Sequence, residues 1–189
     1  GAERVEAVIT SQVDDRWQPI SGTEREWPCD TLLLSVGLIP ENELSRMAGV
    51  ALDPVTVGPV VDESMATSVP GVYAAGNVVQ VYDLVDDVTE SALRAGRFAA
   101  EYALRGECEH GARVRVVAGQ NVRHVVPQYV DLGRLAEEAV PVQFRVRQPV
   151  EQAVRAEVHA SDTVILSRRL RYVRPSEMVT LTLEPKHAA

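Results

Sequence analysis

A short apolar run that ends in a glycine and an amide, and is followed by a long helical pattern, sets the expected fold class of this chain. The run 72–75 (VYAA) is apolar and follows a Pro-Gly turn, which predicts a buried strand. Gly76 and Asn77 come directly after it, and a glycine there permits a positive φ or a close backbone approach. A strand, a turn and a helix in this order are typical of α/β folds.

The helical pattern after this turn has one face made largely of small residues. Small or apolar residues recur at helical spacing at Val88, Ala92, Ala95, Ala99 and Tyr102. Asp87 and Glu90 have the spacing of a capping box, so we expect the helix to open at Asp87 and to end at Gly106. A face of small residues allows the helix to pack very close to its neighbour.

Further α/β elements are expected before this turn. Residues 5–10 alternate and predict a strand, with a return strand beginning at 17–20. The run 31–36 is apolar on both faces, which is typical of a buried parallel strand. Residues 41–48 predict a short helix, and 60–62 a short strand.

The sequence pattern changes at residue 113, after which short alternating stretches dominate. Six strands are predicted, at 114–117, 122–126, 142–146, 154–158, 164–170 and 178–183. Turn residues separate them, so the segment predicts a small antiparallel sandwich or barrel. The boundary is expected at 108–112.

Composition narrows the class of function. The net charge is −8 and the sequence pI is about 5.0, which argues against non-specific binding of nucleic acid or anionic membranes. No apolar run is long enough to span a bilayer, and the first residues lack a signal-peptide layout. Cys29 and Cys108 form no C-x-x-C motif, which favours a reducing cytoplasm. Four scattered histidines, His110, His124, His159 and His187, give no metal-ligand spacing, so no metal is expected.

Three motifs, in order, carry a resemblance to a known family. An apolar strand ends in G-x-x-P at 37–40; a short strand with Asp62 precedes T-S-x-P-G-x-Y-A-A-G at 67–76; and a helix contains A-x-x-A-G-R-x-A-A at 92–100. Together they resemble the C-terminal third of FAD/NAD(P)-dependent pyridine nucleotide-disulfide oxidoreductases. The chain is most similar to the branch of the glycerol-3-phosphate-dehydrogenase-associated flavoproteins and the flavoprotein subunits of opine oxidase and cyanide synthase.

The resemblance implies a fold and a division into domains. It implies a partial, truncated α/β dinucleotide-binding fold followed by a small antiparallel β-sandwich. Residues 1–36 would be the tail of an NAD(P)-binding domain, with a β-meander and its last strand. Residues 37–110 would be the C-terminal part of an FAD-binding domain, and 111–189 a β-sandwich-like C-terminal domain.

The resemblance also implies cofactor-binding residues. Gly76 and Asn77 stand where the family has Gly-Asp, whose aspartate contacts the ribityl region of the flavin. The amide of Asn77 can still donate and accept hydrogen bonds, but it carries no negative charge. Val88, Thr89 and Glu90 would present backbone N–H groups to flavin O2, and the positive helix end would favour reduced, anionic flavin. No acid, base or nucleophile is assigned.

The implied function is that of an FAD-dependent NAD(P)H oxidoreductase, which passes hydride or electrons between nicotinamide, flavin and a substrate or partner subunit. The Gly-rich turns G-x-G-x-x-G for FAD and NAD(P) are missing from the sequence. We therefore expect a fragment that is inactive alone, carries little or no flavin, and needs the remainder of its own FAD/NAD(P) domains. A homodimer is also possible.

Two other readings of the residues stay open. Strand, Gly-Asn turn and helix are also ordinary α/β scaffolding. A different class of function is a non-enzymatic interaction module built on the C-terminal β-sandwich. A separate hypothesis for the C-terminal domain of the flavoprotein is that the exposed face with Arg168, Arg169 and Arg171 docks an acidic partner subunit.

Overall fold

The computed structural model describes residues 3–14, 16, 18–34, 37–106 and 111–188. The chain divides into two compact units, Gly1–Leu38 and Ile39–Ala189. Cys108 and His110, together with residues 35–36, lie outside the described residues. No helix in the described ranges is both long and apolar enough to cross a membrane.

Within its described residues, the first unit contains an antiparallel hairpin, and the predicted meander stays a prediction. β1 (Ala7–Thr10) pairs with β2 (Arg25–Pro28), and the indole Nε1 of Trp27 donates to Thr10 Oγ1 at 3.0 Å. Of the predicted return strand at 17–20, Trp17 lies outside the described residues and Pro19 makes one bridge to Val13.

The buried strand predicted at 31–36 is wrong for its described part. Residues 31–34 form no strand, and Leu33 and Leu34 are 89% and 73% exposed. A strand that is apolar on both faces needs paired neighbours and covering layers, and no described residue pairs with this run.

The first part of the second unit is held by turns more than by strands. α1 (Glu43–Met47) and the 3₁₀ turn η1 (Gly76–Val78) are its only helical elements before α2 within the described residues. The strands predicted at 60–62 and 72–75 are reduced to single bridges, between Asp62 and Tyr129 and between Ala66 and Tyr73.

Buried Asn42, 1% exposed, ties this segment together. Its Nδ2 donates to the carbonyl oxygens of Val57 at 3.0 Å and Val78 at 2.8 Å, and its Oδ1 accepts from Ser45 Oγ at 2.8 Å. Close to these contacts, Gly58 packs so tightly that an added Cβ would lie 1.8 Å from the carbonyl oxygen of Val79. One side-chain amide and one tightly packed glycine therefore help to hold these loops in place.

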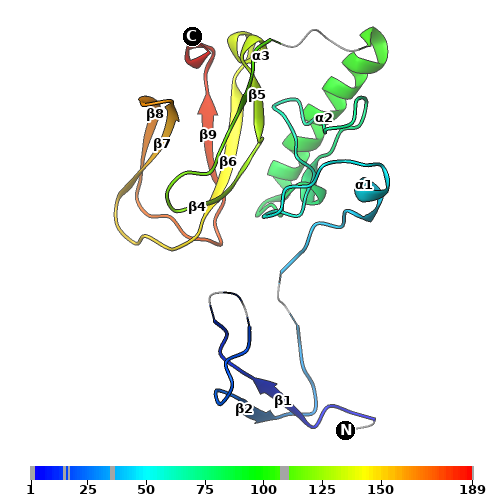
Figure 1. The fold of residues 1–189 in the computed structure, drawn as a ribbon, viewed down its shortest axis with the longest axis vertical. Helices are drawn as coiled ribbons and strands as arrows, with labels where there is room; N and C mark the ends of the chain where they lie inside the picture. The colour runs from blue at the N-terminus through cyan, green and yellow to red at the C-terminus, as the bar shows by residue number, and fades with distance from the viewer. Residues whose placement is uncertain (1–2, 15, 17, 35–36, 107–110, 189) are drawn as a thin grey trace. The chain divides into compact units, whose positions relative to one another are not determined.

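The long helix of the second unit is α2 (Val85–Arg105), drawn in green in Figure 1. It begins two residues before the predicted start. Its N-cap is Leu84, with no side-chain cap, and Asp87 lies inside the first turn, so the predicted capping box is wrong. The predicted end is confirmed: Gly106 has φ +76° and its N–H donates to Tyr102 O. Ala95 and Phe98 are buried on the inner face.

The six strands predicted after residue 113 are present with small changes in their bounds. β4 (Val122–Val126), β6 (Val140–Val146) and β9 (Val179–Leu183) form a three-stranded antiparallel sheet, and β7 (Val154–Ala160) pairs with β8 (Thr163–Leu170) (Figure 1). β3 (Arg113–Arg115) pairs with β5 (Tyr129–Asp131), a strand not predicted. The helix α3 (Leu132–Glu137) and the 3₁₀ turn η2 (Pro185–His187) were also not predicted.

Among the described residues, the core of the second unit consists of two apolar clusters. One contains Val125 with residues of β6 and β9, and the other contains Val61, Met65, Val79 and Ala95 with Val126 of β4. Adjacent residues of β4 thus face different clusters, so burial of both faces stabilises this strand by about 2 kcal/mol per large side chain. The sandwich and the domain boundary at 110 stay predictions.

Candidate functional site

The Gly76–Asn77 turn is pressed against α2. Gly76 is buried, has φ +70°, and its N–H donates to Ser91 Oγ at 3.3 Å. An added Cβ would stand 3.2 Å from Cγ1 of Val88. Glycine is required here both for the positive φ and for the close approach of the helix.

Asn77 is exposed and shapes the loop that follows it. Its Oδ1 accepts a hydrogen bond from the N–H of Tyr82 at 3.1 Å. Its Nδ2 has no hydrogen-bond partner among the described residues. The carbonyl end of this amide is therefore structural, and the NH₂ end is available to a ligand.

The start of α2 determines which N–H groups lack partners inside the helix. Because the helix begins at Val85 with Leu84 as its N-cap, these groups belong to Leu84, Val85, Asp86 and Asp87. The N–H of Val88 donates to Leu84 O at 3.4 Å. The contacts assigned to Val88, Thr89 and Glu90 stay predictions, and the partner-free donors lie one turn earlier. The acidic side chains in the first turn stabilise the positive end of the helix.

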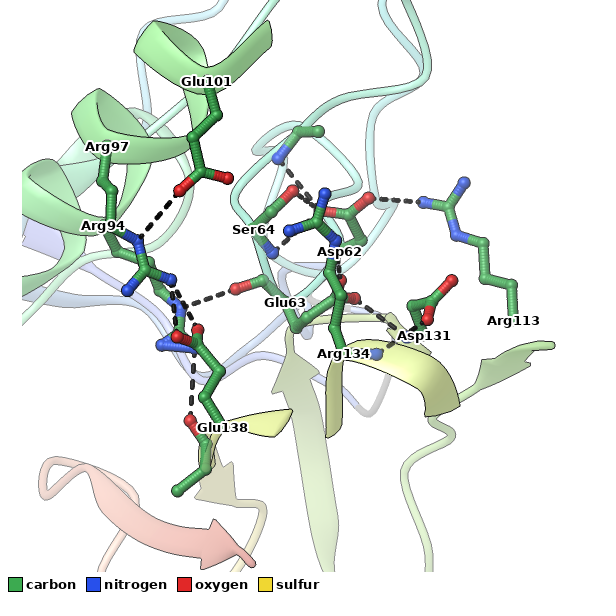
Figure 2. Close-up of polar contacts among 12 residues, drawn as sticks. Asp62, Glu63, Ser64, Arg94, Arg97, Glu101, Arg113, Asp131, Arg134 and Glu138 are labelled. Carbon is green, nitrogen blue, oxygen red and sulfur yellow. Dashed lines mark hydrogen bonds and ion pairs between the residues drawn. The ribbon is translucent and has the colours of Figure 1, made fainter. Parts of the chain in front are cut away.

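A buried acidic turn, Asp62–Glu63–Ser64, joins this part of the unit to the C-terminal strands (Figure 2). Asp62 Oδ1 accepts from Ser64 Oγ at 2.6 Å and from the N–H of Ala66 at 3.1 Å. Its Oδ2 forms an ion pair with Arg113 at 3.3 Å. These bonds fix the turn that precedes the T-S-x-P-G motif.

Glu63 faces the start of α3 (Figure 2). Its Oε2 accepts from the N–H of Asp131 at 3.0 Å, and Oε1 lies 3.5 Å from Nε of Arg134. Burial raises the pKa of this carboxyl, and the neighbouring charge of Asp62 raises it further. The site thus holds a carboxylate whose charged form is disfavoured.

Two arginines of α2 clamp Glu138, directly after α3 (Figure 2). Arg94 Nη2 lies 2.9 Å from Glu138 Oε1, and Arg97 contacts both carboxylate oxygens at 2.6 and 2.7 Å. Arg94 Nε also donates to Glu63 O at 2.6 Å. Both guanidinium groups lie over the ring of Phe98, at 5.9 and 4.2 Å.

A second clamp holds the loop that follows Asn77. Arg145 of β6 donates to Val81 O at 3.0 Å and forms an ion pair with Asp83. Buried Gln80 donates from Nε2 to Gln143 Oε1 at 2.8 Å. No local pattern predicts this clamp, because Arg145 is one of many arginines on alternating strands.

The described residues assemble no group of three or more His, Cys, Asp or Glu side chains that could hold a metal. Cys29 is a free thiol in the first unit. Arg168, Arg169 and Arg171 are exposed, although Nη1 of Arg168 donates to Thr180 O. The chemistry that this geometry supports is hydrogen bonding to a ligand beside the Gly76–Asn77 turn.

The segment that contains the Gly76–Asn77 turn and the first part of α2 matches a known protein family. The chain belongs to the pyridine nucleotide-disulphide oxidoreductase family, whose model matches residues 2–97, about half of the chain. The family predicted from the three motifs is thereby confirmed. The specific branch stays a prediction.

Three curated proteins are similar to parts of the chain. The chain is 46% identical over 54 residues, 29% of its length, to the ferredoxin–NAD(+) reductase component of the biphenyl dioxygenase system of Paraburkholderia xenovorans (strain LB400). It is 30% identical over 156 residues, 75% of its length, to the ferredoxin reductase component of the chlorobenzene dioxygenase of Cupriavidus sp. (strain PS12). It is 29% identical over 142 residues, 68% of its length, to subunit beta of the NADP(+)-dependent formate dehydrogenase of Moorella thermoacetica.

The matched regions make up 12%, 37% and 19% of these three relatives, in that order. The chain therefore spans well under half the length of the curated relatives that it matches. No solved structure matches the chain significantly.

Proposed function

We propose that this chain is part of an FAD-dependent NAD(P)H oxidoreductase that passes hydride or electrons between a nicotinamide, a flavin and a substrate or partner subunit. The observation that carries the proposal is the family match over residues 2–97, which includes the Gly76–Asn77 turn and the first part of α2. The relatives named as reductase components and as a dehydrogenase subunit support a partner subunit.

The residues present fit one edge of FAD. The NH₂ group of Asn77 is exposed and has no partner in the described ranges, so it can donate to a ribityl or phosphate oxygen. Gly76 keeps the backbone of this turn close to α2, whose positive end favours negative charge nearby. Bound FAD would supply the two-electron redox chemistry.

The same residues do not make a complete cofactor site. A Gly-rich turn that cradles a pyrophosphate does not occur in the sequence. Asp86 and Asp87 in the first turn of α2 also place negative charge near the helix end. We therefore propose that 1–36 and 37–110 are the C-terminal parts of NAD(P)- and FAD-binding domains, and that these 189 residues alone retain little flavin.

The test uses two purified proteins: the 189-residue chain and the product of the complete reading frame that contains it. The second should show the visible absorbance band of a flavin, which NADH or NADPH bleaches in the absence of oxygen. Replacing Asn77→Leu in it should weaken FAD binding about tenfold, as expected for loss of one hydrogen bond to a charged ligand.

The control is Gln152→Leu, which makes a comparable amide-to-apolar change at an exposed position. Its affinity for FAD should equal that of the unaltered protein. A complete protein without flavin, even after incubation with FAD, would contradict the proposed function and would favour the interaction module. A cell fractionation of the producing organism tests the expected cytoplasmic location.

A further inference from the structure

We propose that Arg145 is a positioning residue that anchors the loop carrying Asn77, residues 77–84, to the C-terminal sheet. The inference deepens the proposed function and rests on it for the link to the flavin. It assigns to the segment after residue 111 a task inside the site, in addition to any contact with partners.

Arg145 joins three segments that lie far apart in the sequence. Its side chain is 12% exposed. Nη2 donates to Val81 O at 3.0 Å and to Asp83 Oδ1, and Nη1 donates to Pro175 O at 3.3 Å. The other carboxylate oxygen of Asp83 accepts from the N–H of Met178 at 2.6 Å. The loop is thus bonded both to β6 and to the segment before β9.

A second contact fixes the same loop to the same face of β6. Gln143 is two residues before Arg145, so both side chains project from one face of the strand. Gln143 accepts from Gln80, which is 1% exposed. The loop is therefore attached at residues 80, 81 and 83, which leaves little freedom to the residues between them.

The anchor reaches Asn77 through one hydrogen bond. Tyr82 lies between the two loop residues that Arg145 holds, and its N–H donates to Asn77 Oδ1 at 3.1 Å. Because that bond orients the side-chain amide of Asn77, a shift of Val81 and Asp83 would change the direction in which its free NH₂ group points. Arg145 thus acts on a ligand through Tyr82 and Asn77.

The guanidinium group is suited to this task in a way that lysine is not. It is planar and has several donors in fixed directions, so one side chain can serve two carbonyl oxygens and a carboxylate together. A lysine ammonium group could keep the ion pair with Asp83 but would not reach all three acceptors. We expect Arg145→Lys to restore the anchor only in part.

The first experiment is amide hydrogen exchange on the 189-residue chain, which needs no flavin. In Arg145→Met the amide of Tyr82 should exchange about tenfold faster or more, because a buried charge-assisted bond no longer restrains the loop. Arg145→Lys should give an intermediate rate. Arg147→Met is the matched control, since Arg147 directly follows β6, two residues after Arg145, and donates to Val122 O, outside the loop.

Asp83→Ala provides a second route if Arg145→Met does not fold, because it removes the loop-side partner without altering the strand. Circular dichroism of each variant checks that α2 and the sheets are retained. An unchanged exchange rate at the Tyr82 amide in the folded variants would overturn the positioning role of Arg145, independently of the result for FAD binding.

The second experiment tests the link to Asn77 in the complete protein, with FAD as the probe. Arg145→Met and Asn77→Leu should each weaken FAD binding about tenfold, and the double variant should be no weaker than either single one. A purely structural effect of Arg145 would instead add to that of Asn77, and additivity would overturn the inference. If Tyr82 exchanges faster in Arg145→Met but the unaltered complete protein binds no FAD, the proposed function would be refuted while the anchoring role of Arg145 would be supported.

Discussion

Replacing Asn42 tests whether its side-chain hydrogen bonds hold the loops before α2 in place. Its side chain is 1% exposed, and its NH₂ group is divided between the carbonyl oxygens of Val57 and Val78. Asn42→Leu would leave both carbonyl groups without this donor. A buried polar group without a partner costs about 1–3 kcal/mol, so the loss of a partner for two carbonyl groups should lower the free energy of unfolding by about 2–6 kcal/mol.

Asn42→Asp adds a prediction about pH. A carboxylate at this place would face two carbonyl oxygens that no longer receive a donor, so the folded state would favour the protonated acid and raise its pKa. The stability deficit of this variant should then be largest at neutral pH. It should shrink as the pH falls through the raised pKa, since the protonated acid can donate one hydrogen bond.

The assay is urea unfolding followed by far-ultraviolet circular dichroism, to which the 21-residue helix α2 contributes strongly. Tryptophan fluorescence would miss the change, because Trp17 and Trp27 both belong to the first unit. Ser45→Ala is the control; it removes only the bond that Asn42 accepts and should cost about 1 kcal/mol. An Asn42→Leu protein within about 0.5 kcal/mol of the unaltered chain would refute the reasoning.

Three further predictions concern packing and pH. Gly58→Ala should destabilise the unit by about 3 kcal/mol or more, because the new Cβ would overlap Val79 O, whereas Gly119→Ala should be nearly neutral in the same urea assay. The raised pKa of Glu63 means that stability falls as pH rises from 4.5 through that pKa; Glu63→Gln should remove this loss in melting temperatures measured against pH. Burial, with Arg123 and Arg145, lowers the pKa of His124 to about 4, so stability should fall as pH drops from 6.5 towards 4, and His124→Leu should flatten that fall.

The two pH effects have opposite signs where their ranges overlap. The profile of melting temperature against pH can therefore be shallow for the unaltered chain, with neither effect visible in it. Only the single variants separate the two effects. The Glu63→Gln chain should still lose stability at low pH, because His124 is unchanged. The His124→Leu chain should still lose stability as the pH rises, because Glu63 is unchanged. A profile that neither variant changes would contradict both assignments.

Local patterns predicted the C-terminal strands well, because each alternates over enough residues to define a face. β5 was missed since Tyr129–Asp131 is only three residues long. The start of α2 was misplaced because Asp87 and Glu90 match a capping box, while the helix is in fact capped by no side chain. The run 31–34 was predicted as a strand from its apolar character, which cannot reveal whether pairing neighbours are present.

The geometry of the candidate turn was predictable in part, whereas its role in cofactor binding stays a prediction. Gly76 and Asn77 follow from the motif, because a positive φ and a close helix impose glycine at one position. Arg145 does not, because its partners Val81 and Asp83 are more than 60 residues away and no local spacing links them. Long-range polar contacts of this kind depend on the assembled fold.

The two clamps that tie α2 and the loop 77–84 to the C-terminal segment have a consequence for how such a chain can be divided or recombined. One clamp joins Arg94 and Arg97 to Glu138, and the other joins Asp83 to Arg145. A chimera that exchanges the segment after residue 111 for that of a relative would also exchange Glu138 and Arg145. The strand-rich segment is therefore inherited together with the helix and loop that it holds, and a successful graft must match these partners first.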